Sequence, residues 1–152
     1  MHRKNIKEEV YSACRAIIIQ RIETCEQAIK EAQEAAGSET KSTAGDKHET
    51  GRAMAHLEQE KNARQLSEAQ TLLSVLNRID AEEKCDEAVL GSVVRTNKGN
   101  FFLSVSAGKF LVNGEVYFAI SLQSPAGAAM LNCKKEDEFR LNNQVFLITE
   151  VF

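Results

Sequence analysis

The chain has 152 residues, a length that suits one ordinary domain or two small ones. Its 19 basic and 22 acidic side chains give a formal net charge of -3, which argues against a general nucleic-acid binder, because such proteins are normally basic. No apolar run approaches the ~18 residues that suggest a membrane span, and the charged first residues do not introduce a secretory signal. We therefore expect a cytoplasmic protein without membrane contact.

Four cysteines are spread along the chain without a CxxC pair. Cys14 and Cys25 fall in one helical pattern, roughly 16 Å apart along its axis, which is too far for a disulfide. We therefore expect no disulfides, as in a reducing compartment, and four reduced, buried thiols. The other two cysteines are Cys85 and Cys133.

A first helical pattern covers residues 4–36, which contain neither Gly nor Pro. Apolar and small residues recur there at spacings of four and three, as in the seam of a two-helix coiled coil. Gly37 is the expected end of this helix. The seam consists of Ile18, Ile22, Cys25, Ile29, Ala32 and Ala36.

A polar loop then leads to a second helical pattern over residues 46–81. Roughly 33 residues of helix make a rod of about 50 Å, and a short loop between two such patterns implies antiparallel neighbours. We predict a long antiparallel coiled-coil hairpin over residues 1–82. The second seam is polar near the loop and apolar far from it, and consists of Ala55, Gln59, Asn62, Leu66, Ala69, Leu73 and Leu76.

Residues 83–152 have a different composition, with all of the Phe residues and the only Pro. Asn113-Gly114 is a strong hairpin signal, and Asn142-Asn143 and Asn97-Lys98-Gly99 are typical of turns. The expected strands are residues 89–95, 101–106, 110–112, 115–121, 138–141 and 144–151.

A short helix is expected over residues 125–131, with Ser124 as its N-cap and Pro125 as its first residue. The predicted fold class is therefore α+β: a helical hairpin followed by a small, mostly antiparallel sheet with one short helix.

The helical tip, residues 45–50, carries Asp46 and Glu49. Residues three apart share one face of a helical turn, and this pair is typical of a capping box, which the helix dipole also favours. A second interpretation is compatible with the first. Two carboxylates could complete a Mg²⁺ site supplied by a partner and help to activate water for phosphodiester hydrolysis. A zinc site of His48 and His56 is disfavoured, because eight residues is not a ligand spacing on a helix.

The segment Gly45-Asp46-Lys47-His48-Glu49 resembles the G-D-x-x-E signature of the GreA/GreB family of bacterial transcript cleavage factors. Residues 120–131, I-S-L-Q-S-P-A-G-A-A-M-L, are similar to the family's I-S-x-x-S-P-x-G-x-A-L-L. The resemblance covers essentially the full length. It implies a coiled coil that enters the secondary channel of RNA polymerase, and an FKBP-like domain over residues 83–152 that docks on the rim of that channel.

The resemblance further implies that Asp46 and Glu49 help the active site of the polymerase to hold a second Mg²⁺ and a water, so that backtracked nascent RNA is cut. The protein would not catalyse alone and would have no cofactor of its own. We expect a monomer that meets the RNA 3′ end at its tip and DNA only through the polymerase. The implied partner-binding residues are Lys41, Lys47, Arg52, Ser124, Pro125, Gly127 and Asp137.

The chain departs from the family pattern in two places. Thr50-Gly51-Arg52-Ala53 stands where the family usually has N-A-E-Y, and residues 132–137, N-C-K-K-E-D, stand where it has G-K-K-x-G-D. A second hypothesis is therefore a channel-binding regulator of the same fold without cleavage activity. Two others come from different classes: a peptidyl-prolyl isomerase or chaperone, which would need an aromatic-lined pocket, and a coiled-coil adaptor whose tip is only a helix cap.

Overall fold

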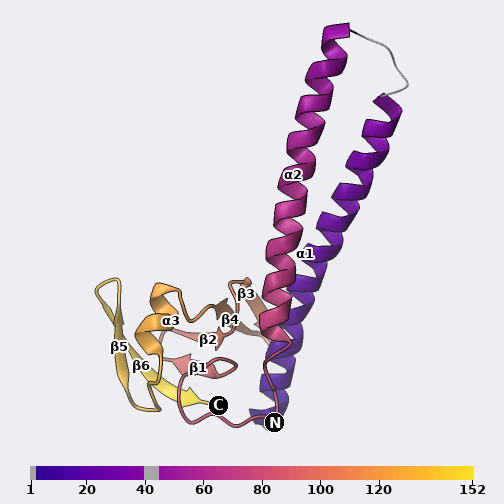
Figure 1. Ribbon diagram of the computed structural model, residues 1–152. Helices are drawn as coiled ribbons and strands as arrows, with labels where there is room; N and C mark the ends of the chain where they lie inside the picture. Colours follow the sequence, from indigo (N-terminus) through magenta and orange to yellow (C-terminus); the bar gives the residue numbers. More distant parts are fainter. Residues whose placement is uncertain (1–2, 40–44) are drawn as a thin grey trace. The chain divides into compact units, whose positions relative to one another are not determined.

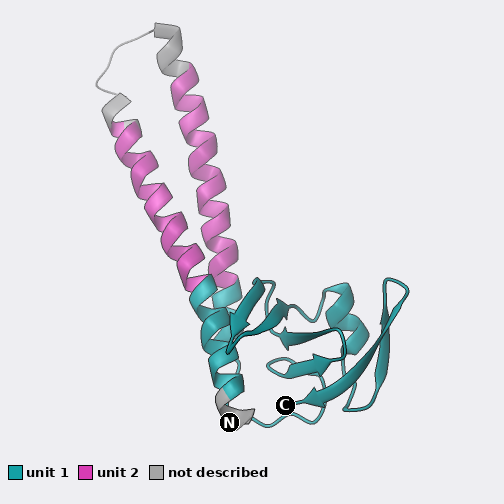
Figure 2. Cartoon of the chain, turned by 180° about the vertical axis from the view of Figure 1, so that it is seen from behind, with its two compact units in different colours: residues 1–17, 72–152 teal, residues 18–71 magenta. Residues whose placement is uncertain are grey.

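The computed structural model describes residues 3–39 and 45–152, with side chains for residues 6–35, 37 and 50–152. The chain divides into two compact units, coloured separately in Figure 2. Residues 1–17 and 72–152 form the sheet unit, and residues 18–71 form the helical unit. Two helices followed by a six-stranded, mostly antiparallel sheet make an α+β fold, as predicted. Among the described residues, no helix has both the length and the apolar character needed to cross a membrane.

The two long helices are α1 (Arg3–Glu39) and α2 (Gly45–Leu76). The prediction that α1 stops at Gly37 is wrong, because the helix continues to Glu39; one glycine inside a helix costs only about 1 kcal/mol. The predicted end of α2 at residue 81 is also wrong. After Leu76, the amides of Arg78 and Ile79 bond to carbonyls three residues back, which tightens and closes the last turn.

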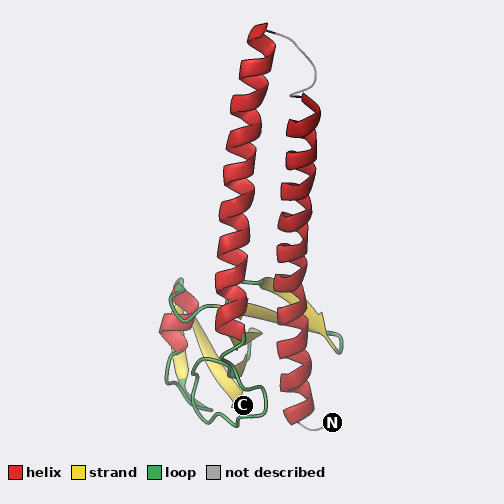
Figure 3. Ribbon diagram, turned by 45° about the vertical axis from the view of Figure 1, so that its right-hand side comes forward, coloured by secondary structure: helices red, strands yellow, loops and turns green. Residues whose placement is uncertain are grey.

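In the helical unit the two helices run side by side in opposite directions, and the views in Figures 1 and 3 agree on this. The predicted seams are the covered sides of these helices. Ile18 is fully buried, and Asn62 and Ala69 are buried to more than nine-tenths. The other described seam residues of this unit are half-buried: Ile22, Cys25, Ile29, Ala32, Ala55, Gln59 and Leu66.

The sheet has the strand order β3-β4-β2-β1-β6-β5, and every neighbouring pair is antiparallel except β2 and β4. The hairpin turns form where they are expected: Asn113, Asn142 and Asn143 adopt positive φ angles of 51°, 51° and 64°. These left-handed residues give the turns the twist of the flanking strands. The strands are β1 (Val93–Thr96), β2 (Gly99–Leu103), β3 (Gly108–Val112), β4 (Glu115–Ile120), β5 (Glu138–Leu141) and β6 (Gln144–Val151).

Neighbouring residues of a strand point to opposite faces of the sheet. Side chains are buried on both of these faces. Helix α3 (Pro125–Met130) covers one face, where Leu103, Met130 and Ile148 are fully buried in one cluster. Figure 1 shows α3 beside β5 and β6. Buried residues of the other face include Val93, Phe102, Tyr117 and Ala119.

The first turns of α1 and the end of α2 belong to the sheet unit and are tied to it by long-range contacts. The Tyr11 hydroxyl donates to the Leu76 carbonyl at 2.9 Å, and Cys14 Sγ lies 3.8 Å from Ser104 Oγ. Asn113 Nδ2 donates to Glu9 Oε2 at 2.7 Å. The last two contacts tie α1 to the segment after β2 and to the turn between β3 and β4.

All four cysteines are thiols outside any disulfide, as expected. The prediction that all four are buried is wrong for Cys25, Cys85 and Cys133, which are half-buried, and holds for Cys14. Cys25 lies on a seam between two helices, and two helices alone leave such residues partly open. Cys85 lies in an irregular segment between α2 and β1.

Candidate functional site

The acid pair of the helical tip belongs to the first two turns of α2. The helix begins at Gly45, so Asp46 is its second residue and Glu49 its fifth. Lys47 lies between them in the sequence. The side chains of all three lie outside the described part of the chain, and Lys41 lies outside it altogether. The predicted role of Asp46 as the N-cap does not match a helix that already begins at Gly45.

Arg52 follows one helical turn after Glu49 and is exposed. Farther along the same helix, Met54 and Leu57 are 67% and 63% exposed. Among the residues whose side chains are described, no group of three or more His, Cys, Asp or Glu could hold a metal ion. The acid pair is not part of that set. Two carboxylates are the kind of oxygen ligand that Mg²⁺ takes, but they are too few to complete its coordination without a partner.

Ser124 caps α3, as predicted. Its Oγ accepts a hydrogen bond from the Gly127 amide at 3.0 Å and donates one to the Ser121 carbonyl at 2.7 Å. Pro125 is the first residue of the helix, where its missing N–H costs nothing. Both donor and acceptor functions of the Ser124 hydroxyl are thus used inside the chain, and Pro125 is exposed beside it.

Gly127 is buried against the chain that enters α3. A Cβ at this position would lie 2.1 Å from the Ser121 carbonyl oxygen and 3.0 Å from Leu122 Cα. No side chain fits there without moving backbone. The glycine of the S-P-x-G segment therefore serves close packing within the sheet unit, and it has no surface to offer a partner.

Asp137 lies in a separate turn before β5. Its Oδ2 accepts from the Lys134 amide at 2.7 Å, and its carbonyl accepts from the Ile148 amide at 2.9 Å. Burial, and secondly the Asp137 charge, raise the pKa of the neighbouring Cys133 thiol. The structure thus brings Ser124, Pro125 and Gly127 together at the start of α3 and gives Asp137 a turn-forming role elsewhere.

The sheet also carries an exposed apolar surface that the sequence did not single out. Leu111 on β3 pairs with Val116 on β4, and Phe118 follows two residues later on the same face. These three residues, which we call the apolar strip, are 67%, 38% and 37% exposed. Phe118 lies 5.9 Å from the ring of half-buried Phe101, so the strip is continuous with the core under α3.

Lysines flank this face of the sheet. Lys109 pairs with Phe118 across β3 and β4, and Lys98 Nζ lies 5.3 Å from the centre of the Phe146 ring. Phe146 in turn lies 6.3 Å from Phe101. An apolar strip between lysines suits a protein surface that presents apolar side chains beside acidic ones.

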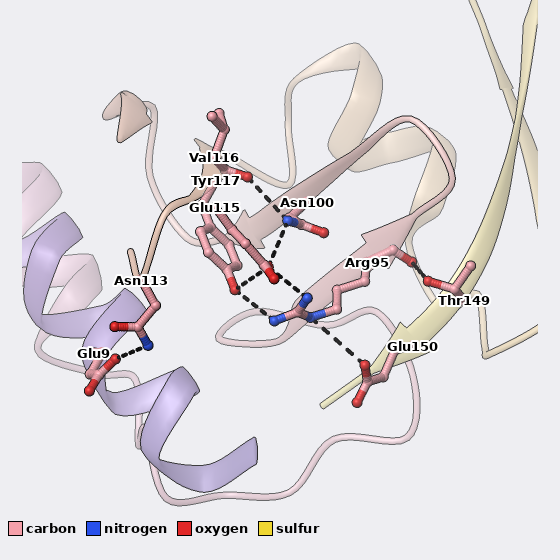
Figure 4. Close-up of polar contacts among 9 residues, drawn as sticks. All are labelled: Glu9, Arg95, Asn100, Asn113, Glu115, Val116, Tyr117, Thr149 and Glu150. Carbon is pink, nitrogen blue, oxygen red and sulfur yellow. Dashed lines mark hydrogen bonds and ion pairs between the residues drawn. The ribbon is translucent and has the colours of Figure 1, made fainter. Parts of the chain in front are cut away.

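The opposite face of the sheet holds a polar network (Figure 4), which sequence reasoning missed. Arg95 Nη1 lies 2.7 Å from Glu115 Oε2, Nη2 donates to the Tyr117 hydroxyl at 2.8 Å, and Nε lies 3.8 Å from Glu150 Oε2. The strand register aligns Glu150, Arg95, Asn100 and Tyr117 in one row across β6, β1, β2 and β4. The only sequence signal was a lone arginine in an apolar strand.

This network has a structural role. Tyr117 is almost fully buried, and burial is the main cause that raises the pKa of its hydroxyl; the Glu115 charge adds to it and the Arg95 charge opposes it. The Arg95 guanidinium already faces two carboxylates and a phenol, which leaves it poorly placed to hold an external anion. The network connects strands β6, β1, β2 and β4, and we assign it no ligand.

Comparison with models of protein families gave no match, and comparison with curated protein sequences gave none.

Proposed function

We propose that this protein is a factor that binds bacterial RNA polymerase and stimulates cleavage of backtracked nascent RNA. In this proposal α1 and α2 form a coiled-coil hairpin that enters the secondary channel. The sheet with α3 is an FKBP-like domain that docks on the rim of the channel. The single observation that carries the proposal is the position of Asp46 and Glu49 in the first two turns of α2, at one end of two long antiparallel helices.

The length of the helices supports this use. The part of α2 in the helical unit, residues 45–71, is about 40 Å long at 1.5 Å per residue. A thin two-helix rod of that length can carry its end residues deep into a narrow passage. The wide exposure of Met54 and Leu57 close to the acid pair also suits a surface that becomes covered by a partner.

The apolar strip supports the docking role of the sheet unit. Leu111, Val116 and Phe118 lie together on one face of the sheet, and all three are exposed. Ser124 and Gly127, from the segment that resembles the family motif, already have structural roles: Ser124 caps α3, and Gly127 packs closely against Ser121. We therefore assign docking to the apolar strip with Lys109, and give the motif the role of shaping α3.

The chemistry would be shared between the two proteins. Mg²⁺, when bound, supplies a more acidic water and neutralises charge on the phosphodiester. The task of this chain is to bring two carboxylate groups to that ion and to accept hydrogen bonds from water bound there. Arg52, exposed one turn later, would face acidic polymerase residues or RNA phosphate.

A channel-binding regulator without cleavage activity is the second candidate. It is favoured by the residues after the acid pair, where Gly51 lies inside α2 and loosens its first turns. A prolyl isomerase is less favoured, because it would need an aromatic-lined pocket. Tyr117, the only tyrosine in residues 83–152, is buried and hydrogen-bonded to Arg95.

The test is release of a short 3′ RNA fragment from purified, backtracked polymerase complexes containing Mg²⁺. The native protein should accelerate release, and the double variant Asp46→Asn, Glu49→Gln should not. Asn and Gln have nearly the same size and shape as Asp and Glu and remain polar, so the variant removes the two negative charges with little other change. Melting temperature and polymerase binding should be unchanged in the variant.

The possible outcomes separate the candidates. Binding without stimulation by the native protein supports the regulator. Failure of the native protein to bind polymerase overturns both candidates and leaves the acid pair as part of a helix start.

A further inference from the structure

A buried amine lies against a half-buried thiol in the sheet unit. Lys7, near the start of α1, is 3% exposed. Its Nζ donates to the Glu83 carbonyl at 2.6 Å and to Cys85 Sγ at 3.4 Å. The two side chains are 78 positions apart in sequence. Among the residues with described side chains, Lys7 is the one buried lysine.

These contacts hold the amine in place. A lysine is buried only where its charge and its three N–H donors find partners. Here the Glu83 carbonyl oxygen and the Cys85 sulfur each accept a hydrogen bond from the Lys7 amine. Cys85 is open enough for a small oxidant to reach, since its residue is only half-buried.

We propose that Lys7 and Cys85 form an oxidation-triggered covalent link, a sulfenamide between Nζ and Sγ, when the protein meets a peroxide. In the first step the Cys85 sulfur attacks one peroxide oxygen. The O–O bond breaks, an S–O bond forms and water leaves. The sulfur is oxidised by two electrons to a sulfenic acid, and the peroxide is reduced.

The second step needs no further oxidant. Lys7 Nζ, after losing one proton to solvent, attacks the sulfur. The N–S bond forms as the S–O bond breaks, and the departing hydroxide takes a second proton from the nitrogen and leaves as water. Condensation of a sulfenic acid with a nitrogen is known chemistry for cysteine, and the proximity of the two atoms favours it over further oxidation.

The link would fasten the first turns of α1 to the segment that leads from α2 into β1. It closes a long loop of the chain, so it should stabilise the folded state by restricting the unfolded chain. A thiol reductant should reverse it. The inference rests on contacts inside the sheet unit alone and does not depend on the proposed function.

The experiment treats the full-length protein with hydrogen peroxide and maps its peptides by mass spectrometry. The expected product joins the Lys7 peptide to the Cys85 peptide, with a mass about 2 Da below their sum, because two hydrogens are lost. The melting temperature should rise after peroxide and return after dithiothreitol. Cys25 and Cys133, also half-buried, serve as internal controls and should gain oxygen without linking to Lys7.

Two variants control the result. Lys7→Arg keeps the positive charge and the donors, but its guanidinium is a poor nucleophile, and Cys85→Ser removes the sulfur; both should abolish the link and the rise in melting temperature. If Lys7→Arg does not fold, Lys7→Gln carries the same test. Conversion of Cys85 in the native protein to sulfinic acid, with Lys7 unmodified, would overturn the inference.

Discussion

The Arg95 guanidinium reaches across β2 and donates a hydrogen bond of 2.8 Å to the Tyr117 hydroxyl on β4. The same guanidinium lies 2.7 Å from Glu115 and 3.8 Å from Glu150, on opposite sides of it. One side chain thus connects β1 to β4 and to β6. The sheet unit should be sensitive to this residue, although it was not conspicuous in the sequence.

Replacing Arg95 with Met should destabilise the protein by about 2 kcal/mol, because Glu115 and Glu150 lose their shared cation and the Tyr117 hydroxyl loses its donor. Urea unfolding measures the change. Arg140→Met, at an exposed position of edge strand β5, is the matched control and should change stability by less than about 0.5 kcal/mol. Equal losses of stability in the two variants would mean that the Arg95 network does not stabilise the fold more than an exposed arginine does.

Alkaline pH should weaken the sheet unit through Tyr117. Burial raises the pKa of this hydroxyl above its ordinary 10.0, so the folded state holds the proton more tightly than the unfolded chain does. The stabilisation is complete below about pH 10 and is lost as the pH rises through the folded pKa. The stability advantage of the native protein over Tyr117→Phe should therefore shrink above about pH 10 in pH-dependent urea unfolding. An advantage that grows with pH would contradict the assigned direction.

Gly127→Ala should destabilise the sheet unit by about 3 kcal/mol, because the added Cβ would fall 2.1 Å from the Ser121 carbonyl oxygen. Thermal unfolding is a suitable measurement. Gly37→Ala is the control within the same chain, since a Cβ there meets nothing within 4 Å. Gly37 lies inside α1, so that change should be neutral or stabilise by up to about 1 kcal/mol. Similar effects at both glycines would refute the packing role of Gly127.

Val116→Glu should weaken binding to RNA polymerase at least tenfold if the apolar strip is the docking surface. Val145→Glu is a close control, because the two valines are 38% and 39% exposed and both lie in strands. Val145 precedes the core residue Phe146 and so faces away from α3. Both variants should have similar stability. Equal loss of binding in both would place docking elsewhere on the chain.

Local signals in the sequence were enough for the elements that depend on neighbouring residues. Asn113-Gly114 and Asn142-Asn143 form the expected turns, and Ser124-Pro125 begins α3 as predicted. Such features follow from backbone preferences of a few consecutive residues. The seam of the helices was predictable for the same reason, because the 3.6-residue period links each position to the next turn.

Features that depend on residues far apart in sequence were not predictable. The parallel pairing of β2 with β4 arises because β3 lies at the sheet edge, and nothing in the strands themselves specifies it. The Arg95 network and the Lys7–Cys85 contact join residues 20 to 78 positions apart. The apolar strip was not predictable, because the sequence does not distinguish Val116 and Phe118 from the buried residues of a strand.

The most direct test of the central claim is the Mg²⁺ dependence of RNA cleavage in backtracked polymerase complexes, measured with the native protein and with Asp46→Asn, Glu49→Gln. If the two acids bring ligands to a shared ion, the native protein should shift half-maximal cleavage to a lower Mg²⁺ concentration. The variant should bind polymerase equally well, and half-maximal cleavage should then need the same Mg²⁺ concentration as with polymerase alone. An identical shift with both proteins would contradict the account, because the carboxylates would then contribute nothing to the metal.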